Sequence, residues 1–187
     1  MCITYEGQYR NNKEVMIMKR IKAILMAAVL ILAMSIPAFA QSVSSDSAVS
    51  TALSNAGLSK SQVRSLEAEF DSEDSTYSVE FVRKSNKAEY EYEISASNGK
   101  ILEKSVEYKY KHNKSKKKIG KNAAVKKVSS FSGISSKVIK TGKCTYKYSH
   151  RQGVYTIKFR KGGYRYEYKV LAPTGKVIEY EWELTGR

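Results

Sequence analysis

The chain has 187 residues, of which 42% are hydrophobic, so it is long enough for one or two modest domains. Its 33 basic and 18 acidic side chains give a net charge of +15, and 14 tyrosines against 2 prolines favour strands over disorder. Two histidines and two cysteines give little support to histidine-based catalysis or to a disulfide scaffold.

The N-terminal 40 residues have the features of an export signal. A basic cluster, residues 19–22, precedes an apolar run, residues 23–36, and the sequence Ala38-Phe39-Ala40. The run is shorter than the roughly 20 residues that span a bilayer, and Ala-x-Ala is typical of a signal peptidase site. We therefore expect cleavage between Ala40 and Gln41 and a secreted, extracytoplasmic mature chain with no transmembrane span. An uncleaved membrane anchor is the alternative.

The first unit, residues 46–107, is predicted to be one helix followed by four strands. Apolar residues from Val49 to Ala56 fall on one helical face, and Gly57 is suited to the left-handed position that ends a helix. From Val63 the apolar period changes to two, which indicates strands. Asn98-Gly99 predicts a tight hairpin turn, because both central residues can take positive φ.

A lysine-rich linker, residues 108–121, leads to a second unit, residues 122–183, that repeats this plan. Its first strand is expected to open at Val138 or Ile139 and to run through Cys144, a half-buried cysteine whose alternative role is pairing between chains. Pro173-Thr174-Gly175 replaces Ser97-Asn98-Gly99, which favours a different turn. The predicted fold class is α+β, with two tandem units that each pack one helix on a four-stranded antiparallel sheet.

The strongest sequence signal is a block that occurs twice. It runs from Tyr90 to Glu103 and again from Tyr166 to Glu179, as Tyr-Glu-Tyr-x-(Ile/Val)-x-Ala-x-x-Gly-Lys-(Ile/Val)-(Leu/Ile)-Glu. With the preceding helix and a Tyr-x-(Val/Ile)-x-Phe strand, both units resemble PepSY domains. The motif residues, which we expect to be structural, are Tyr90, Tyr92, Gly99, Tyr166, Tyr168 and Gly175.

PepSY domains occur in propeptides of thermolysin-type metallopeptidases and in many secreted or membrane-attached bacterial proteins. The family is proposed to inhibit or restrain peptidases. The resemblance therefore implies a secreted, non-catalytic module that modulates a peptidase of the cell envelope or surroundings. It implies no catalytic, cofactor-binding or metal-binding residues, and we predict no enzyme and no cofactor.

The acidic residues Asp71, Glu73 and Asp74 lack the spacing of a calcium loop, so a solvated turn is favoured there.

Charge is unevenly distributed along the chain. Residues 41–110 carry 8 basic and 12 acidic side chains, whereas residues 111–187 carry 20 and 4. The alternative function is therefore a basic adhesion protein that binds anionic envelope polymers through the second unit and linker. Two further interpretations are that the basic half docks on an acidic peptidase, or that the two units attract one another. Nucleic acid is disfavoured as a partner because the chain is predicted to be exported. The candidate polyanion-binding residues are Lys114, Lys116, Lys117, Lys118, Lys121, Lys126 and Lys127.

Overall fold

A computed structural model describes residues 43–110, 118–149 and 152–186. The predicted cleavage site at Ala40 and Gln41 lies outside these residues, as do residues 111–117 of the predicted linker. Residues 41–187 form a compact unit of their own. Within the described part of the chain, the structure has no helix of the length and apolar character that a bilayer crossing requires.

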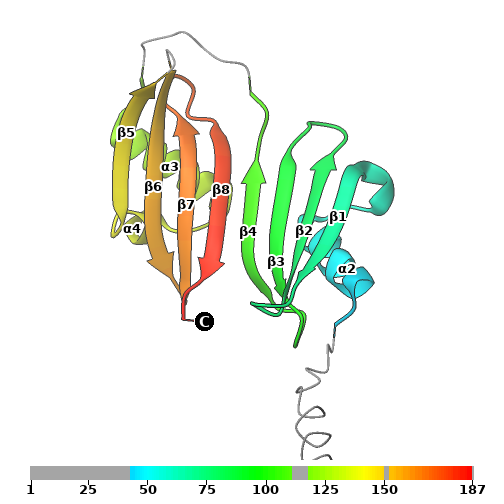
Figure 1. The fold of residues 1–187 in the computed structure, drawn as a ribbon. Helices are drawn as coiled ribbons and strands as arrows, with labels where there is room; N and C mark the ends of the chain where they lie inside the picture. Colours follow the sequence, from blue (N-terminus) through cyan, green and yellow to red (C-terminus); the bar gives the residue numbers. More distant parts are fainter. Residues whose placement is uncertain (1–42, 111–117, 150–151, 187) are drawn as a thin grey trace, which may run out of the picture. The chain divides into compact units, whose positions relative to one another are not determined.

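Eight strands form one antiparallel sheet in the order β1-β2-β3-β4-β8-β7-β6-β5 (Figure 1). The first half contains α2 (Ser45–Ala56), η1 (Lys60–Gln62), β1 (Val63–Asp71), β2 (Thr76–Arg83), β3 (Glu89–Ser95) and β4 (Ile101–Glu107). The second half contains α3 (Lys121–Ser132), α4 (Ser136–Ile139), β5 (Lys143–Ser149), β6 (Gln152–Lys161), β7 (Tyr164–Leu171) and β8 (Val177–Leu184). The predicted α+β class, with a helix and a four-stranded meander in each half, is confirmed.

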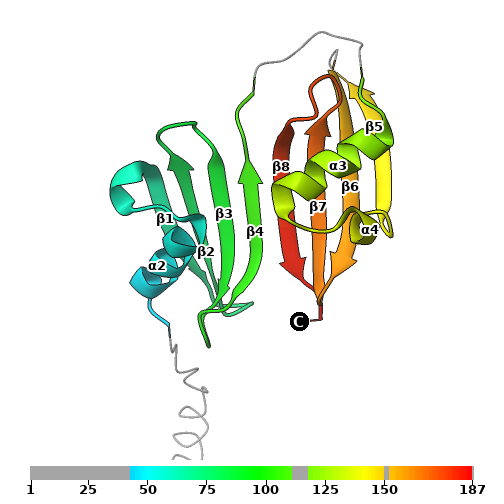
Figure 2. The same ribbon diagram turned by 180° about the vertical axis from the view of Figure 1, so that it is seen from behind.

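The two meanders join edge to edge through β4 and β8. These strands pair in the antiparallel sense from Glu103 opposite Glu183 to Glu107 opposite Glu179. The longer helices α2 and α3 lie on the same face of the sheet, α2 over the first half and α3 over the second (Figure 2). The opposite face, which we call the outer face, carries no helix of the described chain.

Helix α2 forms because its ends are capped and one of its faces is apolar. The Ser44 hydroxyl accepts a hydrogen bond from the Ser47 amide at 3.2 Å, and Gly57 ends the helix at φ 66°. The buried side of the helix consists of Ala48, Val49, Ala52 and Leu53. This face packs on the inner side chains of β1 and β2, which lie on every second residue.

The two halves have matching aromatic cores. In the first, the Phe81 ring stacks on Tyr90 and Tyr92, with centroids 5.0 and 5.9 Å apart. In the second, Phe159 stacks on Tyr166 and Tyr168 at 5.1 and 5.9 Å. Such stacked rings contribute beyond the apolar area that they bury. The repeated sequence block therefore gives the same packing in each half.

The predicted turns of the repeated block are wrong in two respects. At the first turn only Gly99 has positive φ, at 71°, so Asn98 does not share the left-handed conformation. The second turn was expected to differ, but it makes the same pair of backbone hydrogen bonds. Gly99 N donates to Ser95 O at 2.8 Å, and Gly175 N donates to Leu171 O at 2.7 Å. Proline fits the second turn because it precedes the positive-φ position and ordinary negative φ suffices there.

The start of β5 is also later than predicted. Val138 and Ile139 belong to α4, whose first turn is capped by the Ser135 hydroxyl accepting from the Lys137 amide at 3.3 Å. Ile139 is buried in the second core as part of this helix. The backbone then passes so close to β6 that a Cβ on Gly142 would lie 2.0 Å from the Lys158 carbonyl oxygen. The apolar pair in the sequence therefore marked a helix turn and not a strand.

Alanine substitution should destabilise the second turn more than the first. Either glycine has positive φ, so adding a Cβ costs about 1–2 kcal/mol of folding free energy. At Gly175 the new Cβ would also lie 3.2 Å from Ile119 Cδ1, whereas at Gly99 it would meet only Val43 Cγ2 at 3.5 Å. Urea denaturation of Gly99→Ala and Gly175→Ala checks this, and equal losses would contradict the role of the neighbouring side chains.

Candidate functional site

The outer face of the sheet carries rows of glutamates that lie directly opposite one another. Glu67 on β1 is opposite Glu80 on β2, which is opposite Glu91 on β3. The row continues to Ser105 on β4 and then to Glu181 on β8. The local cause is the alternation Glu-Tyr-Glu-Tyr-Glu, in which a period of two sends tyrosines into the core and glutamates outward.

Two further rows cross the junction of the two halves. Glu103 is opposite both Glu93 and Glu183, and Glu107 is opposite both Glu89 and Glu179. Like charges at opposite positions of a sheet are destabilising. We call these side chains the acidic face: Glu67, Glu69, Glu80, Glu89, Glu91, Glu93, Glu103, Glu107, Glu179, Glu181 and Glu183.

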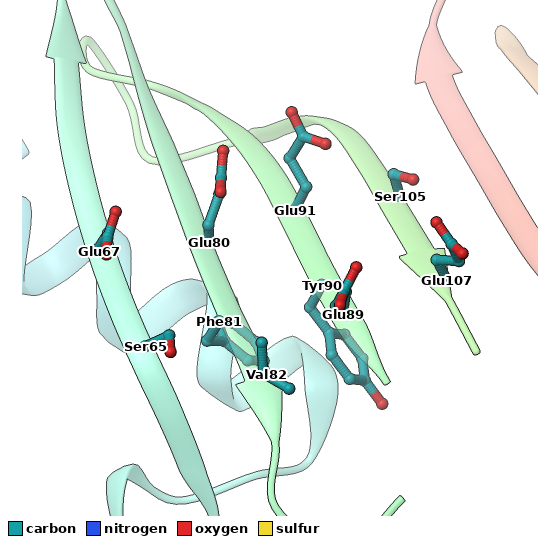
Figure 3. Close-up of a pocket in the computed structure, with 10 residues that line it drawn as sticks. All are labelled: Ser65, Glu67, Glu80, Phe81, Val82, Glu89, Tyr90, Glu91, Ser105 and Glu107. Carbon is teal, nitrogen blue, oxygen red and sulfur yellow. The ribbon is translucent and has the colours of Figure 1, made fainter. Parts of the chain in front are cut away.

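Two shallow hollows open on the acidic face within the first half. The first, of about 270 Å³, is lined by ten residues that include Glu67, Glu80 and Glu91. Figure 3 shows these three side chains standing on three neighbouring strands, with the helix on the far side of the sheet. The second hollow, of about 200 Å³, shares Glu91 and Ser105 with the first. The acidic face is therefore an uneven surface, lined by carboxylate and hydroxyl oxygens.

Basic side chains border the acidic face on the β7 side. Lys169 Nζ lies 2.6 Å from Glu179 Oε1, and the guanidinium of Arg165 pairs with Glu183. Between them, burial raises the pKa of the Glu181 carboxyl, and the charge of Glu167 raises this pKa further. Ion pairs thus border the acidic face along β7 and β8, and on β3 Glu89 Oε1 lies 2.6 Å from Lys109 Nζ.

On the helix side of the sheet, Lys104 is a charged side chain inside the core, with 8% of its surface exposed. Its Nζ donates to Asn55 Oδ1 at 2.8 Å and lies 5.2 and 5.8 Å from the ring centres of Tyr92 and Tyr180. Burial lowers the pKa of this amine to about 8. Lys104 could not be predicted from the sequence, because a single lysine in a strand pattern indicates a solvent-exposed position.

The predicted polyanion-binding lysines are only partly described by the structure. Lys114, Lys116 and Lys117 lie outside the described residues. Lys118 has its Nζ 4.7 Å from the ring centre of Tyr146. The remaining three lie on α3, and all are exposed: Lys121, Lys126 and Lys127. These lysines are therefore on the helix side of the sheet and not on the acidic face.

The motif tyrosines and glycines lie in the cores and turns described above. Tyr92 is 1% exposed, and its hydroxyl donates to Asn55 Oδ1 at 3.2 Å. Burial raises the pKa of Tyr92 and raises that of Tyr168 to about 12. Tyr90 is also buried, and Tyr166 is half-buried. In this structure the conspicuous tyrosine stripe forms the sheet's inner surface.

Few side chains in the described part of the chain are arranged for catalysis or for metal binding. No three His, Cys, Asp or Glu side chains of residues 43–110, 118–149 and 152–186 are grouped so that they could hold a metal ion. Both histidines, His112 and His150, lie outside these ranges. Asp71 Oδ1 accepts from the amides of Glu73 at 2.8 Å and Asp74 at 3.4 Å. That acidic turn is thus held by backbone hydrogen bonds.

Comparison with protein families identifies the first half of the molecule. Residues 42–104 match PepSY, the family described as peptidase propeptide and YPEB domain. This segment is a PepSY domain. The match begins just before α2 and ends within β4, so the PepSY domain supplies the β1–β3 part of the acidic face. Residues 121–184 repeat its order of helix and four strands, and β8 of that repeat completes the face.

Three solved structures are similar to this chain. The Bacillus megaterium YpeB C-terminal domain is 19% identical at a TM-score of 0.43, covering 75% of this chain and 63% of its own. A candidate lipoprotein from Clostridium difficile 630 is 21% identical at 0.28, covering 65% and 82%. A DUF2874 family protein from Bacteroides uniformis is 12% identical at 0.26, covering 71% and 86%. This chain thus spans less than two thirds of the YpeB domain, and no curated protein sequence matches it.

Neutralising one glutamate of the acidic face should stabilise the fold. Glu80→Gln removes the repulsion with Glu67 and Glu91, so the free energy of unfolding is expected to rise by about 0.2–1 kcal/mol. The gain should shrink at about 1 M salt, because salt screens exposed charges. Urea denaturation at low and high salt measures it. Glu73→Gln, in the exposed turn after β1, is the matched control; the same gain there would point to net charge alone.

Proposed function

We propose that this protein is a secreted, non-catalytic binding module that restrains or modulates a peptidase outside the cytoplasm. The observation that carries the proposal is the PepSY domain at residues 42–104, a family described by its occurrence in peptidase propeptides. The export-type N-terminus supports the location, and the scarcity of catalytic groups among the described residues supports a role without turnover.

The acidic face offers a contact surface for such a partner. Its rows of glutamates lie on regular strands, which hold them in place without a partner, and their mutual repulsion is relieved when a basic surface docks. Complementary charge speeds encounter and selects the partner more than it adds affinity. We therefore expect the peptidase to present lysine or arginine side chains to β1–β3.

The test uses residues 41–187, which form a compact unit, and the secreted peptidases of the native culture medium. Addition of the protein should slow or alter cleavage of a casein substrate, and Glu80→Gln with Glu91→Gln should weaken the effect about tenfold or more. Glu73→Gln should leave it unchanged. A peptidase activity unaffected by saturating protein, or turnover of substrate by the purified protein itself, would refute the proposal.

A second candidate function is adhesion to anionic polymers of the cell envelope. It is favoured by the exposed lysines of α3 and α4, none of which forms an ion pair with another described residue. Retention on a polyphosphate or teichoic-type matrix should fall steeply with salt and with Lys126→Gln plus Lys127→Gln. Retention that changes neither with salt nor with these substitutions would exclude adhesion to anionic polymers. The Glu80→Gln variant serves as control.

A further inference from the structure

The outer backbone edges of the two end strands of the sheet are a feature that neither proposed function uses. In the strand order β1 and β5 are the two ends, so each pairs on one side only among the described strands. The other side presents backbone N–H and C=O groups, which can template pairing with another strand. Beyond an irregularity between Arg64 and Glu67, β1 is regular from Glu67 to Asp71.

Both edges also expose aromatic side chains on the helix side of the sheet. Phe70 on β1 is 46% exposed, and Tyr146 and Tyr148 on β5 are 40% and 45% exposed. Phe70 lies opposite the buried Tyr77, and Tyr146 lies opposite the buried Tyr155. Three of the four large, exposed hydrophobic side chains in the described chain are therefore on the two edge strands.

On the outer face the two edges carry opposite charges. Strand β5 places Lys143 and Lys147 on this face, and β1 places Glu67 and Glu69 there. All four side chains are exposed. Charged residues on an edge usually prevent pairing between copies. Here they oppose pairing of β1 with β1 or of β5 with β5, whereas β5 beside β1 places lysine near glutamate.

The topology of the sheet makes that mixed pairing geometrically regular. All neighbouring strands are antiparallel and there are eight of them, so β1 and β5 run in opposite directions. A second copy shifted along the sheet therefore brings its β1 antiparallel to β5 of the first. In this arrangement the helices stay on one face, and the register that sets Tyr146 opposite Phe70 also sets Lys147 opposite Glu69.

We propose that copies of this protein associate head to tail, with β5 of one copy adding to residues 67–71 of β1 in the next. The interface is heterologous, because the two surfaces that meet are different, and such contacts build open chains when the rotation between copies does not close a ring. The proposal stands on the edges alone and does not depend on peptidase binding.

The test is sedimentation of residues 41–187 over a range of concentrations. The average mass should rise above that of the monomer. The variant Lys143→Glu plus Lys147→Glu should weaken association by about tenfold or more, because the attraction between Lys147 and Glu69 becomes repulsion and the β5 edge becomes acidic like the β1 edge. The variant Glu67→Lys plus Glu69→Lys should do the same. A mixture of the two variants should associate again, since each then offers an edge opposite in charge to the partner's.

Matched controls separate this interface from an effect of net charge. Lys126→Glu plus Lys137→Glu changes the charge as much as the β5 variant does, but on exposed helix positions, and should associate like the wild type. A protein that stays monomeric at millimolar concentration would overturn the proposal. So would association that the edge variants leave intact, or a mixture that fails to reassociate although each variant keeps the wild-type circular dichroism spectrum.

Discussion

Replacing Phe81 with alanine is expected to lower the free energy of unfolding by about 3–5 kcal/mol. The ring is 1% exposed and stacks on Tyr90 and Tyr92 beneath α2, so truncation removes buried apolar area and leaves a cavity. A loss of this size is a large fraction of the total stability of a small domain. Urea denaturation followed by circular dichroism measures it.

The matching substitution in the second half tests whether the sheet unfolds as one unit. Phe159→Ala should lower the free energy of unfolding by a similar amount, because Phe159 is 3% exposed and stacks on the equivalent pair, Tyr166 and Tyr168. Tyr180 packs against both cores, and β4 pairs with β8 across the junction. We therefore expect either variant to shift a single transition.

Two transitions, of which each variant moves only one, would show that the halves unfold separately. Phe131→Ala is the control, because that ring is 45% exposed on α3 and its removal should cost much less. If Phe131→Ala lowered the free energy of unfolding as much as the two core variants, the assignment of the cores would be contradicted.

The parts of the fold that the sequence predicts well are those set by local period. The apolar face of α2 follows from residues three and four apart, and the inward tyrosines of β3 follow from a period of two. In both cases the side that an apolar residue faces depends only on its neighbours in the chain. Helix ends are equally local, because Gly57 and Gly133 adopt the left-handed conformation that ends α2 and α3.

The junction of the two meanders was not predictable from the same signals. Its outer face sets Glu103 and Glu107 opposite Glu183 and Glu179, so charge alone argues against the pairing. Its inner face sets Val106 opposite Tyr180, which packs against both cores. A contact between strands that are far apart in the chain is decided by this buried side, whose value depends on packing that the sequence does not display.

The candidate site predicted from the sequence differs from the acidic face of the structure for a related reason. The distribution of charge along the chain favoured the lysines of residues 114–127 as the binding site, since residues 111–187 carry 20 basic and 4 acidic side chains. The structure shows that charge is sorted by face and strand, because the acids of β8 join those of the first half. The alternation of Glu179, Glu181 and Glu183 indicates that these side chains share one face of β8. Only the pairing of β4 with β8 shows that this face continues the glutamate rows of the first half.

The stability of the protein is expected to rise by up to about 3 kcal/mol between pH 8 and pH 10 because of Lys104. Burial lowers the pKa of its amine from the ordinary 10.5 to about 8. In this range the unfolded lysine still binds a proton that the folded lysine has released, so raising the pH favours the folded state. Below pH 8 both states are protonated, and the folded protein bears the full cost of a buried charge.

Lys104→Met should therefore stabilise the protein at pH 7 by about 1–3 kcal/mol and remove the rise between pH 8 and pH 10. Methionine keeps the apolar stem beside Tyr92 and Tyr180 but loses the hydrogen bond to Asn55, which accounts for the lower end of the range. Urea denaturation at intervals of pH measures both effects. Lys100→Met, at an exposed turn position, is the matched control and should change neither.

Above pH 10 a second group of residues acts in the opposite direction. Burial raises the pKa of Tyr92 and Tyr180, so the unfolded tyrosines lose protons first and stability falls as the pH rises further. This fall is common to wild type and variant, so the difference between their two curves isolates Lys104. A variant that is less stable at pH 7 with an unchanged profile would mean that the hydrogen bond to Asn55 outweighs the cost of the buried charge.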